Sequence, residues 1–90
     1  MRGRFDLWEQ LDLPGESLPG QVVVEITGDN RVLVEHHRGV REYSRECIGV
    51  NVKFGVVQIC GRCLQLRCMT KDQLVISGKI DGVTLKRREG

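Results

Sequence analysis

The sequence predicts an all-β fold, a small single domain of about seven or eight short, mostly antiparallel strands that form a curled sheet, roll or sandwich. From Gln21 onward apolar residues recur with a period of two, as they do along half-buried strands. Glycine-containing turn clusters interrupt this alternation at the spacing typical of small β domains, roughly eight to twelve residues. No helical stretch separates the expected strands, which excludes parallel βαβ units.

The length of 90 residues fits one domain, in which we distinguish three parts. Residues 1–20 are expected to form a short N-terminal arm, because Leu-Pro-Gly occurs twice there and proline restricts the residue before it. This arm is either a frayed terminus or a docking segment that uses Trp8 and Leu11. Residues 21–85 are expected to form the β domain, and residues 86–90 a solvated tail.

Three strands are expected in the first half of the β domain. Residues 21–26 alternate between valine or isoleucine and other residues. The turn at 27–30 contains glycine, aspartate and asparagine, which tolerate the left-handed backbone of tight hairpins. Residues 31–34 and residues 39–43 are the second and third strands.

The second half of the β domain contains strands with internal glycines. Residues 47–54 place four apolar side chains on one face, namely Ile48, Val50, Val52 and Phe54. After a turn at Gly55, Ile59-Cys60-Gly61 is echoed by Ile76-Ser77-Gly78. Glycine inside a strand pattern indicates a bulge or a bend, so each echo predicts a strand that bends sharply to start another. Such bends would curl a small sheet.

Composition and charge argue against several classes of function. The net charge is only +2 and aromatic residues are scarce, so we expect no nucleic-acid partner. No apolar run is long enough to span a membrane and the N-terminus does not resemble a signal peptide, so a cytoplasmic location is expected. Four arginines could form a basic patch that captures phosphate, namely Arg38, Arg41, Arg45 and Arg62. Because Glu35, Glu42 and Glu46 lie among the first three, we expect a salt-bridged face instead.

The cysteines offer an alternative function, a metal- or redox-responsive module built on the Cys60/Cys63 CxxC motif and Cys68. A structural zinc site usually needs a second pair of ligands, and a redox CxxC begins a helix, whereas both flanks here are expected strands. Cys68 shares the parity of Leu64 and Leu66, so it is expected in the core. We therefore expect no metal, no cofactor and, since no nucleophile has an identifiable base, no enzyme.

His36 and His37 lie at the centre of the sequence pattern, between the second and third expected strands. If the strand continues through them, their side chains point to opposite faces and cannot bind one metal together. One exposed and one half-buried histidine are therefore expected. Gly39 is expected at a turn that only glycine adopts easily. His37 and Arg38 either form a structural clasp with a nearby glutamate or bind a partner, and both interpretations stay open.

Four segments together resemble the YabP/YqfC family of sporulation proteins, more closely its YqfC branch: residues 11–14, residues 34–40 with Tyr43, residues 59–61 and residues 74–80. The likeness covers roughly residues 11 to 85. The central family motif is similar to V-E-N-H-R-G-I, and His36 takes the place of the usual asparagine. The residues that remain in register are Glu35, His37, Arg38 and Gly39.

The resemblance implies a non-catalytic sporulation protein that acts in the mother cell as a small β assembly and interaction module. It also implies a partner, a sporulation membrane protein of the YqfD type, which would hold the chain at the forespore membrane. Open sheet edges must be covered, so a homo-oligomer is a further expectation.

Overall fold

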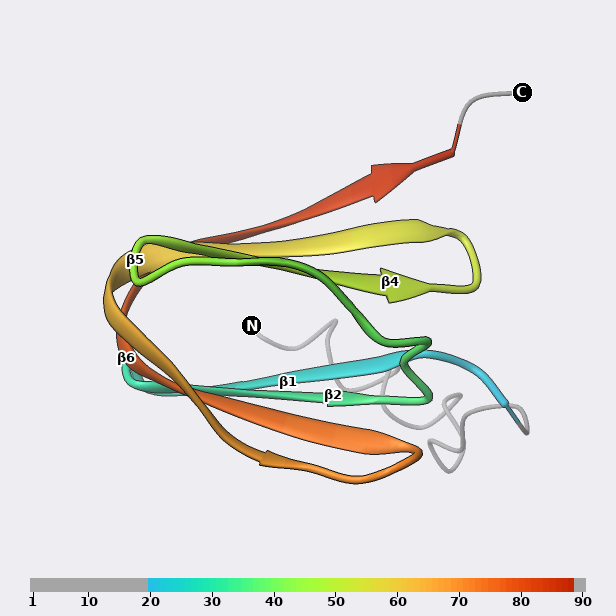
Figure 1. Ribbon diagram of the computed structural model, residues 1–90, viewed down its shortest axis with the longest axis horizontal. Coiled ribbons are helices and arrows are strands. Elements are labelled where there is room, and N and C mark those ends of the chain that lie inside the picture. Colours follow the sequence, from blue (N-terminus) through green and yellow to red (C-terminus); the bar gives the residue numbers. More distant parts are fainter. Residues whose placement is uncertain (1–19, 89–90) are drawn as a thin grey trace, which may run out of the picture.

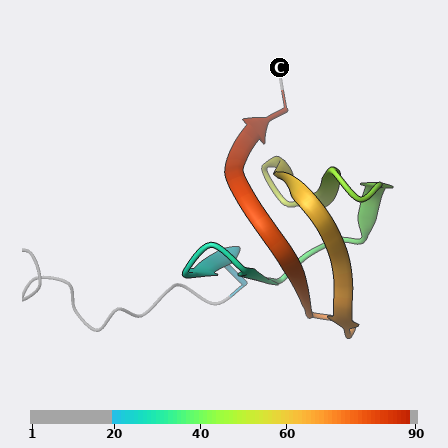
Figure 2. The same cartoon turned by 90° about the vertical axis from the view of Figure 1, so that its left-hand side faces the viewer.

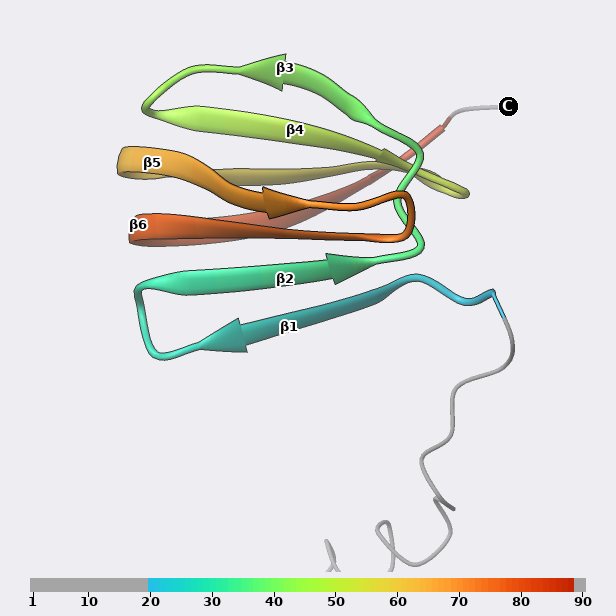
Figure 3. The same cartoon turned by 60° about the horizontal axis from the view of Figure 1, so that its bottom comes forward.

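The computed structural model describes residues 20–88 and contains six antiparallel strands in one sheet. Their order across the sheet is β1-β2-β6-β5-β4-β3, as Figure 3 shows. The strands are β1 (Val23–Thr27), β2 (Arg31–Glu35), β3 (Val40–Tyr43), β4 (Cys47–Val52), β5 (Gly55–Met69) and β6 (Gln73–Arg87). The residues described contain no helix, so the expected all-β fold is confirmed.

Two long strands, β5 and β6, fold the sheet over on itself. Each has 15 residues, and both bend on the same side of the molecule (Figures 1 and 2). The first part of β6 pairs with β2 from Gln73 to Ser77, whereas the first part of β5 pairs with β4 from Gly55 to Cys60. One layer therefore contains β1, β2, the first part of β6 and the last part of β5. The other layer contains β3, β4, the first part of β5 and the last part of β6.

Glycines allow the backbones of β5 and β6 to approach closely at the bend. A Cβ atom on Gly61 would collide with the carbonyl oxygen of Lys79. A Cβ atom on Gly78 would lie 2.6 Å from the carbonyl oxygen of Cys63, and Gly78 has a φ of 139°. The pairing register also shifts at Cys60/Gly61, Arg62/Gln65 and Leu66/Cys68. Both glycine echoes thus mark bends, as expected.

The bends also explain why there are six strands rather than seven or eight. The sequence pattern predicts two short strands in place of each long bent strand, because the apolar alternation breaks down where the pairing register shifts. Cys68 illustrates the same effect: it is exposed, so its expected core position is wrong. The bulge inserts Arg67 between the paired residues Leu66 and Cys68, which moves Cys68 to the other face.

Apolar side chains from both layers fill the space between them. The alternation expected in β4 is confirmed for its three strand residues, while Phe54 is half-buried at the turn. The buried core comprises Val32, Val34, Ile48, Val50, Val52, Val57, Ile59, Leu64, Leu74 and Ile76. Because a domain of this size has limited surface to bury, each of these side chains matters for stability.

The ends of the described region differ from the expected boundaries. Lys86 and Arg87 pair with Val56 and Gly55, so β6 extends into the expected tail. The sequence missed this extension because charged residues on an exposed strand carry no apolar alternation. The expected arm, with Trp8 and Leu11, lies outside the described residues. Within residues 20–88 no helix is long and apolar enough to cross a bilayer.

Candidate functional site

The turn from Glu35 to Gly39 carries the chain from β2, in one layer, to β3, in the other. It lies on the side of the molecule opposite the bend (Figure 1). The strand does not continue through the histidines, because His36 has a φ of 65° and Gly39 a φ of 106°. Both values lie in the left-handed region, which glycine and, less readily, asparagine and histidine adopt. His36 is exposed and donates from Nδ1 to the carbonyl oxygen of Gln21, 2.8 Å away.

His37 is the buried polar residue of this turn, with 9% of its surface exposed. Its Nδ1 accepts a hydrogen bond from the Gly39 backbone N–H, over 2.9 Å. The proton must therefore be on Nε2, which donates to the carbonyl oxygen of Thr70, also over 2.9 Å. Both ring nitrogens are thus paired, and the imidazole joins its own turn to the turn between β5 and β6.

Backbone hydrogen bonds reinforce this junction on both sides. The N–H groups of His36 and His37 donate to the carbonyl oxygen of Asp72, at 2.6 and 3.4 Å. On the other side, Arg38 N–H donates to Asn51 O at 2.7 Å, and Asn51 N–H donates to Gly39 O at 2.8 Å. The turn therefore links the β5–β6 turn of one layer to β4 of the other and closes the open side of the folded sheet.

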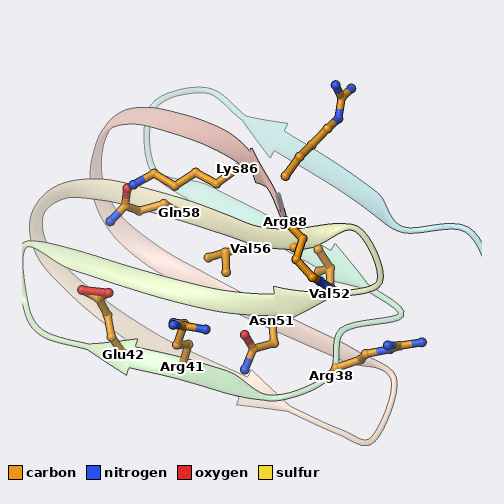
Figure 4. Close-up of a pocket in the computed structure, with 11 residues that line it drawn as sticks. Arg38, Arg41, Glu42, Asn51, Val52, Val56, Gln58, Lys86 and Arg88 are labelled. Carbon is orange, nitrogen blue, oxygen red and sulfur yellow. The ribbon is translucent and has the colours of Figure 1, made fainter. Parts of the chain in front are cut away.

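We call the four residues in register with the family motif the signature residues: Glu35, His37, Arg38 and Gly39. Their surroundings divide them into two groups. The carboxylate of Glu35 accepts a hydrogen bond from Gln73 Nε2 at 2.8 Å, so it belongs to the same junction as His37 and Gly39. The side chain of Arg38 is exposed and extends outward from the strands, as Figure 4 shows. Three of the four residues thus shape the turn, and Arg38 is available to another molecule.

Arg38 stands at the rim of a hollow of about 700 Å³. The hollow lies over β3, β4, the start of β5 and the end of β6, on the face that carries Val56 and Gln58 (Figure 4). The lining residues are Arg38, Arg41, Glu42, Asn51, Val52, Gly55, Val56, Gln58, Lys86, Arg87 and Arg88. They include five cationic side chains and one carboxylate, so the hollow is suited to an anionic group.

Among residues 20–88, no carboxylate lies within ion-pair distance of the cations around the hollow. In the described part of the chain the one ion pair joins Lys79 to Asp29, 3.9 Å apart. The salt-bridged face expected from the mixed arginines and glutamates is therefore wrong. One reason is that the carboxylate of Glu35 is engaged by Gln73 of β6 instead of by an arginine.

The cysteines of the CxxC motif do not gather in the fold. Cys63 and Cys68 are exposed, and no three His, Cys, Asp or Glu side chains within residues 20–88 are placed to hold a metal ion. Cys60 instead faces Cys47 across β4 and β5, with 3.0 Å between the sulfur atoms. The hydrogen bond to the Cys47 sulfur, followed by burial, raises the pKa of the Cys60 thiol. The sequence pattern missed this pair, although counting back from the Gly55 turn would place both residues opposite each other.

A comparison with known families gives one match. The family model described as the YabP family matches residues 20–90, which is most of the chain. No curated protein and no solved structure matches.

Proposed function

The chain belongs to the YabP family, which implies a role related to sporulation, and from this premise we propose that it acts as a non-catalytic docking module in spore formation. The module works in the mother cell, belongs to the YqfC branch and binds a sporulation membrane protein of the YqfD type. It remains in the cytoplasm and reaches the forespore membrane through that partner.

The observation that carries the proposal is the basic hollow beside the open edge of β3. Arg41 is the extra residue at the bulge of that strand, between Val40 and Glu42, so it has no partner residue in β4. No described strand pairs with the outer side of β3. An acidic segment of the partner that lies along this edge would gain both backbone hydrogen bonds and charge complementarity.

The edges of the sheet also support self-assembly. The other edge strand, β1, exposes its outer side among the described residues and carries Ile26, which is 52% exposed. Unpaired strand edges are templates for further pairing, so two copies joined through β1 would leave the hollow free for the membrane partner. Light scattering on the purified protein measures this directly.

Capture of the membrane partner from detergent solution tests the docking proposal. We expect the wild-type chain to retain a YqfD-type protein, and the Arg38→Glu/Arg41→Glu variant to lose it, because reversed charges repel an acidic segment. The matched control is Arg45→Glu/Lys71→Glu, which reverses two exposed charges outside the hollow. Equal capture by both variants would place the partner elsewhere, and failure of the wild-type chain to capture it would end the proposal.

The metal- or redox-responsive CxxC module stays a prediction. This alternative predicts that Cys60 and Cys63 bind a metal ion, or that replacing both by serine changes the stability of the fold. Elemental analysis of the purified protein, together with thermal melting of the Cys60→Ser/Cys63→Ser variant, measures both requirements.

A further inference from the structure

Cys47 and Cys60 occupy opposite positions at the far end of the β4–β5 hairpin. They are Cα partners in the antiparallel ladder, and their sulfur atoms are 3.0 Å apart. Both side chains are half-buried. An S–S bond is about 2.05 Å long, so the two sulfurs are roughly 1 Å from bonding distance.

The backbone hydrogen bonds show whether Cys47 and Cys60 form a hydrogen-bonded or a non-hydrogen-bonded pair of the antiparallel ladder. Gly61 N–H donates to Glu46 O at 3.0 Å, so the ladder bond lies one residue beyond each cysteine. Cys47 itself directs its N–H to Ser44 Oγ and accepts at its carbonyl from Ser44 N–H, away from β5. Cys47 and Cys60 are therefore a non-hydrogen-bonded pair, in which side chains come closer than in the alternate positions.

This pair type is compatible with a cross-strand disulfide. Cα atoms in such pairs are about 4.5 Å apart, which falls at the short end of the range of about 4.4 to 6.8 Å spanned by disulfides. Immediately after Cys60 the register of β5 against β6 shifts, so the ladder there is already irregular. The remaining closure thus requires side-chain rotation and a small backbone adjustment, not refolding.

We propose that Cys47 and Cys60 are a disulfide-forming site that reacts with small disulfides such as an oxidised low-molecular-weight thiol. The Cys47 thiolate attacks one sulfur of the small disulfide and releases one thiolate. Cys60 then loses its proton, attacks the Cys47 sulfur and releases the second thiolate. Two protein thiols are oxidised while the small disulfide is reduced to two thiols.

The surroundings assign the first step to Cys47. Gln58 Nε2 donates a hydrogen bond to the Cys47 sulfur over 3.3 Å, which holds the Cys47 side chain in place on this face of the sheet. Cys60 has a raised pKa, first because of its side-chain hydrogen bond with Cys47 and second because of its burial, so it is suited to the second step. Gln58 also lines the basic hollow. A disulfide between Cys47 and Cys60 would therefore rigidify the face of the sheet that carries the hollow.

Peptide mapping of the folded, full-length chain tests the site, because trypsin separates all four cysteines. Cleavage after Arg45, Lys53, Arg62, Arg67 and Lys71 gives the cysteine peptides 46–53, 54–62, 63–67 and 68–71. After incubation with oxidised glutathione and alkylation, we expect peptides 46–53 and 54–62 to be linked. Cys63 and Cys68 should be alkylated, and dithiothreitol should remove the link.

Two controls distinguish a built site from random oxidation. In urea the links should spread over all cysteine pairs, whereas the Cys63→Ser/Cys68→Ser variant should form the Cys47–Cys60 link to the wild-type extent when folded. The oxidised wild-type chain should also melt at a higher temperature than the reduced chain, because the bond closes a loop in the unfolded state. Glutathione adducts without a link, or links that chiefly involve Cys63 or a second chain, would overturn the proposal.

Discussion

At the scale of single residues, the turn between β2 and β3 depends on backbone conformation and on one imidazole. His36 and Gly39 both have left-handed backbones. Asparagine and histidine are among the non-glycine residues most often found with positive φ. His36 is therefore a residue type that suits this turn.

Gly39→Ala isolates the cost of that backbone conformation. A Cβ on Gly39 would meet no atom within 4 Å, so any destabilisation comes from its φ of 106°. We expect a loss of about 1–2 kcal/mol in the free energy of unfolding. Gly82→Ala is the matched control, since a Cβ there also meets nothing within 4 Å and its φ is not positive. Urea denaturation measures both variants, and an equal effect would contradict the role of the turn.

His37→Ala removes the side chain that joins the two turns. The Gly39 N–H and the Thr70 carbonyl would lose their partner, so we expect a cost of about 1–3 kcal/mol in the free energy of unfolding. His36→Ala should cost less, because that side chain is exposed and makes one hydrogen bond. Chemical denaturation of both variants provides the comparison. If His36→Ala proves the more harmful, the assignment of the two histidines is reversed.

At the scale of elements, the bent strands β5 and β6 determine the architecture. They carry the core across both layers, and the glycines at their bends permit backbone contacts that a side chain would prevent. Local alternation predicts a strand well where pairing is regular, as in β4. It fails across a bulge, because one extra residue moves every later side chain to the other face.

Gly61→Ala should strongly disrupt the fold. The added Cβ meets the main chain of β6 at Lys79, which cannot move without changing the bend. We expect a loss of about 3 kcal/mol or more. Gly49→Ala in β4 is the control, since its Cβ would lie at an ordinary contact distance of 3.6 Å from Glu42 and Val56. Thermal melting of both proteins measures the difference, and a wild-type-like Gly61→Ala would show that the bend does not need glycine.

The features that the sequence could predict are those encoded locally. The period of two and the turn glycines each depend on a few neighbouring residues. The partner of His37, by contrast, is a carbonyl oxygen 33 positions away, and the partner of Cys60 depends on the register of β4 against β5. The basic hollow combines Arg38 with Lys86 and Arg87, which only the folded sheet brings to one face.

At the scale of the whole molecule, the residues that shape the turn and the residue that we propose to bind a partner are neighbours in sequence. His37 and Gly39 close the open side of the sheet, and Arg38 stands between them in sequence with its side chain outside. Substitutions at the first two should therefore reduce stability, whereas charge reversal at Arg38 and Arg41 should leave the fold intact. This separation allows the binding proposal to be tested apart from folding.

The most direct measurement is the yield of heat-resistant spores from cells that carry only a variant of this gene. Our account predicts that Arg38→Glu/Arg41→Glu lowers the yield although the protein accumulates normally, because its docking surface is lost. The control Arg45→Glu/Lys71→Glu should give the wild-type yield. A full spore yield from Arg38→Glu/Arg41→Glu would contradict the claim that the basic hollow is the surface through which this protein serves sporulation.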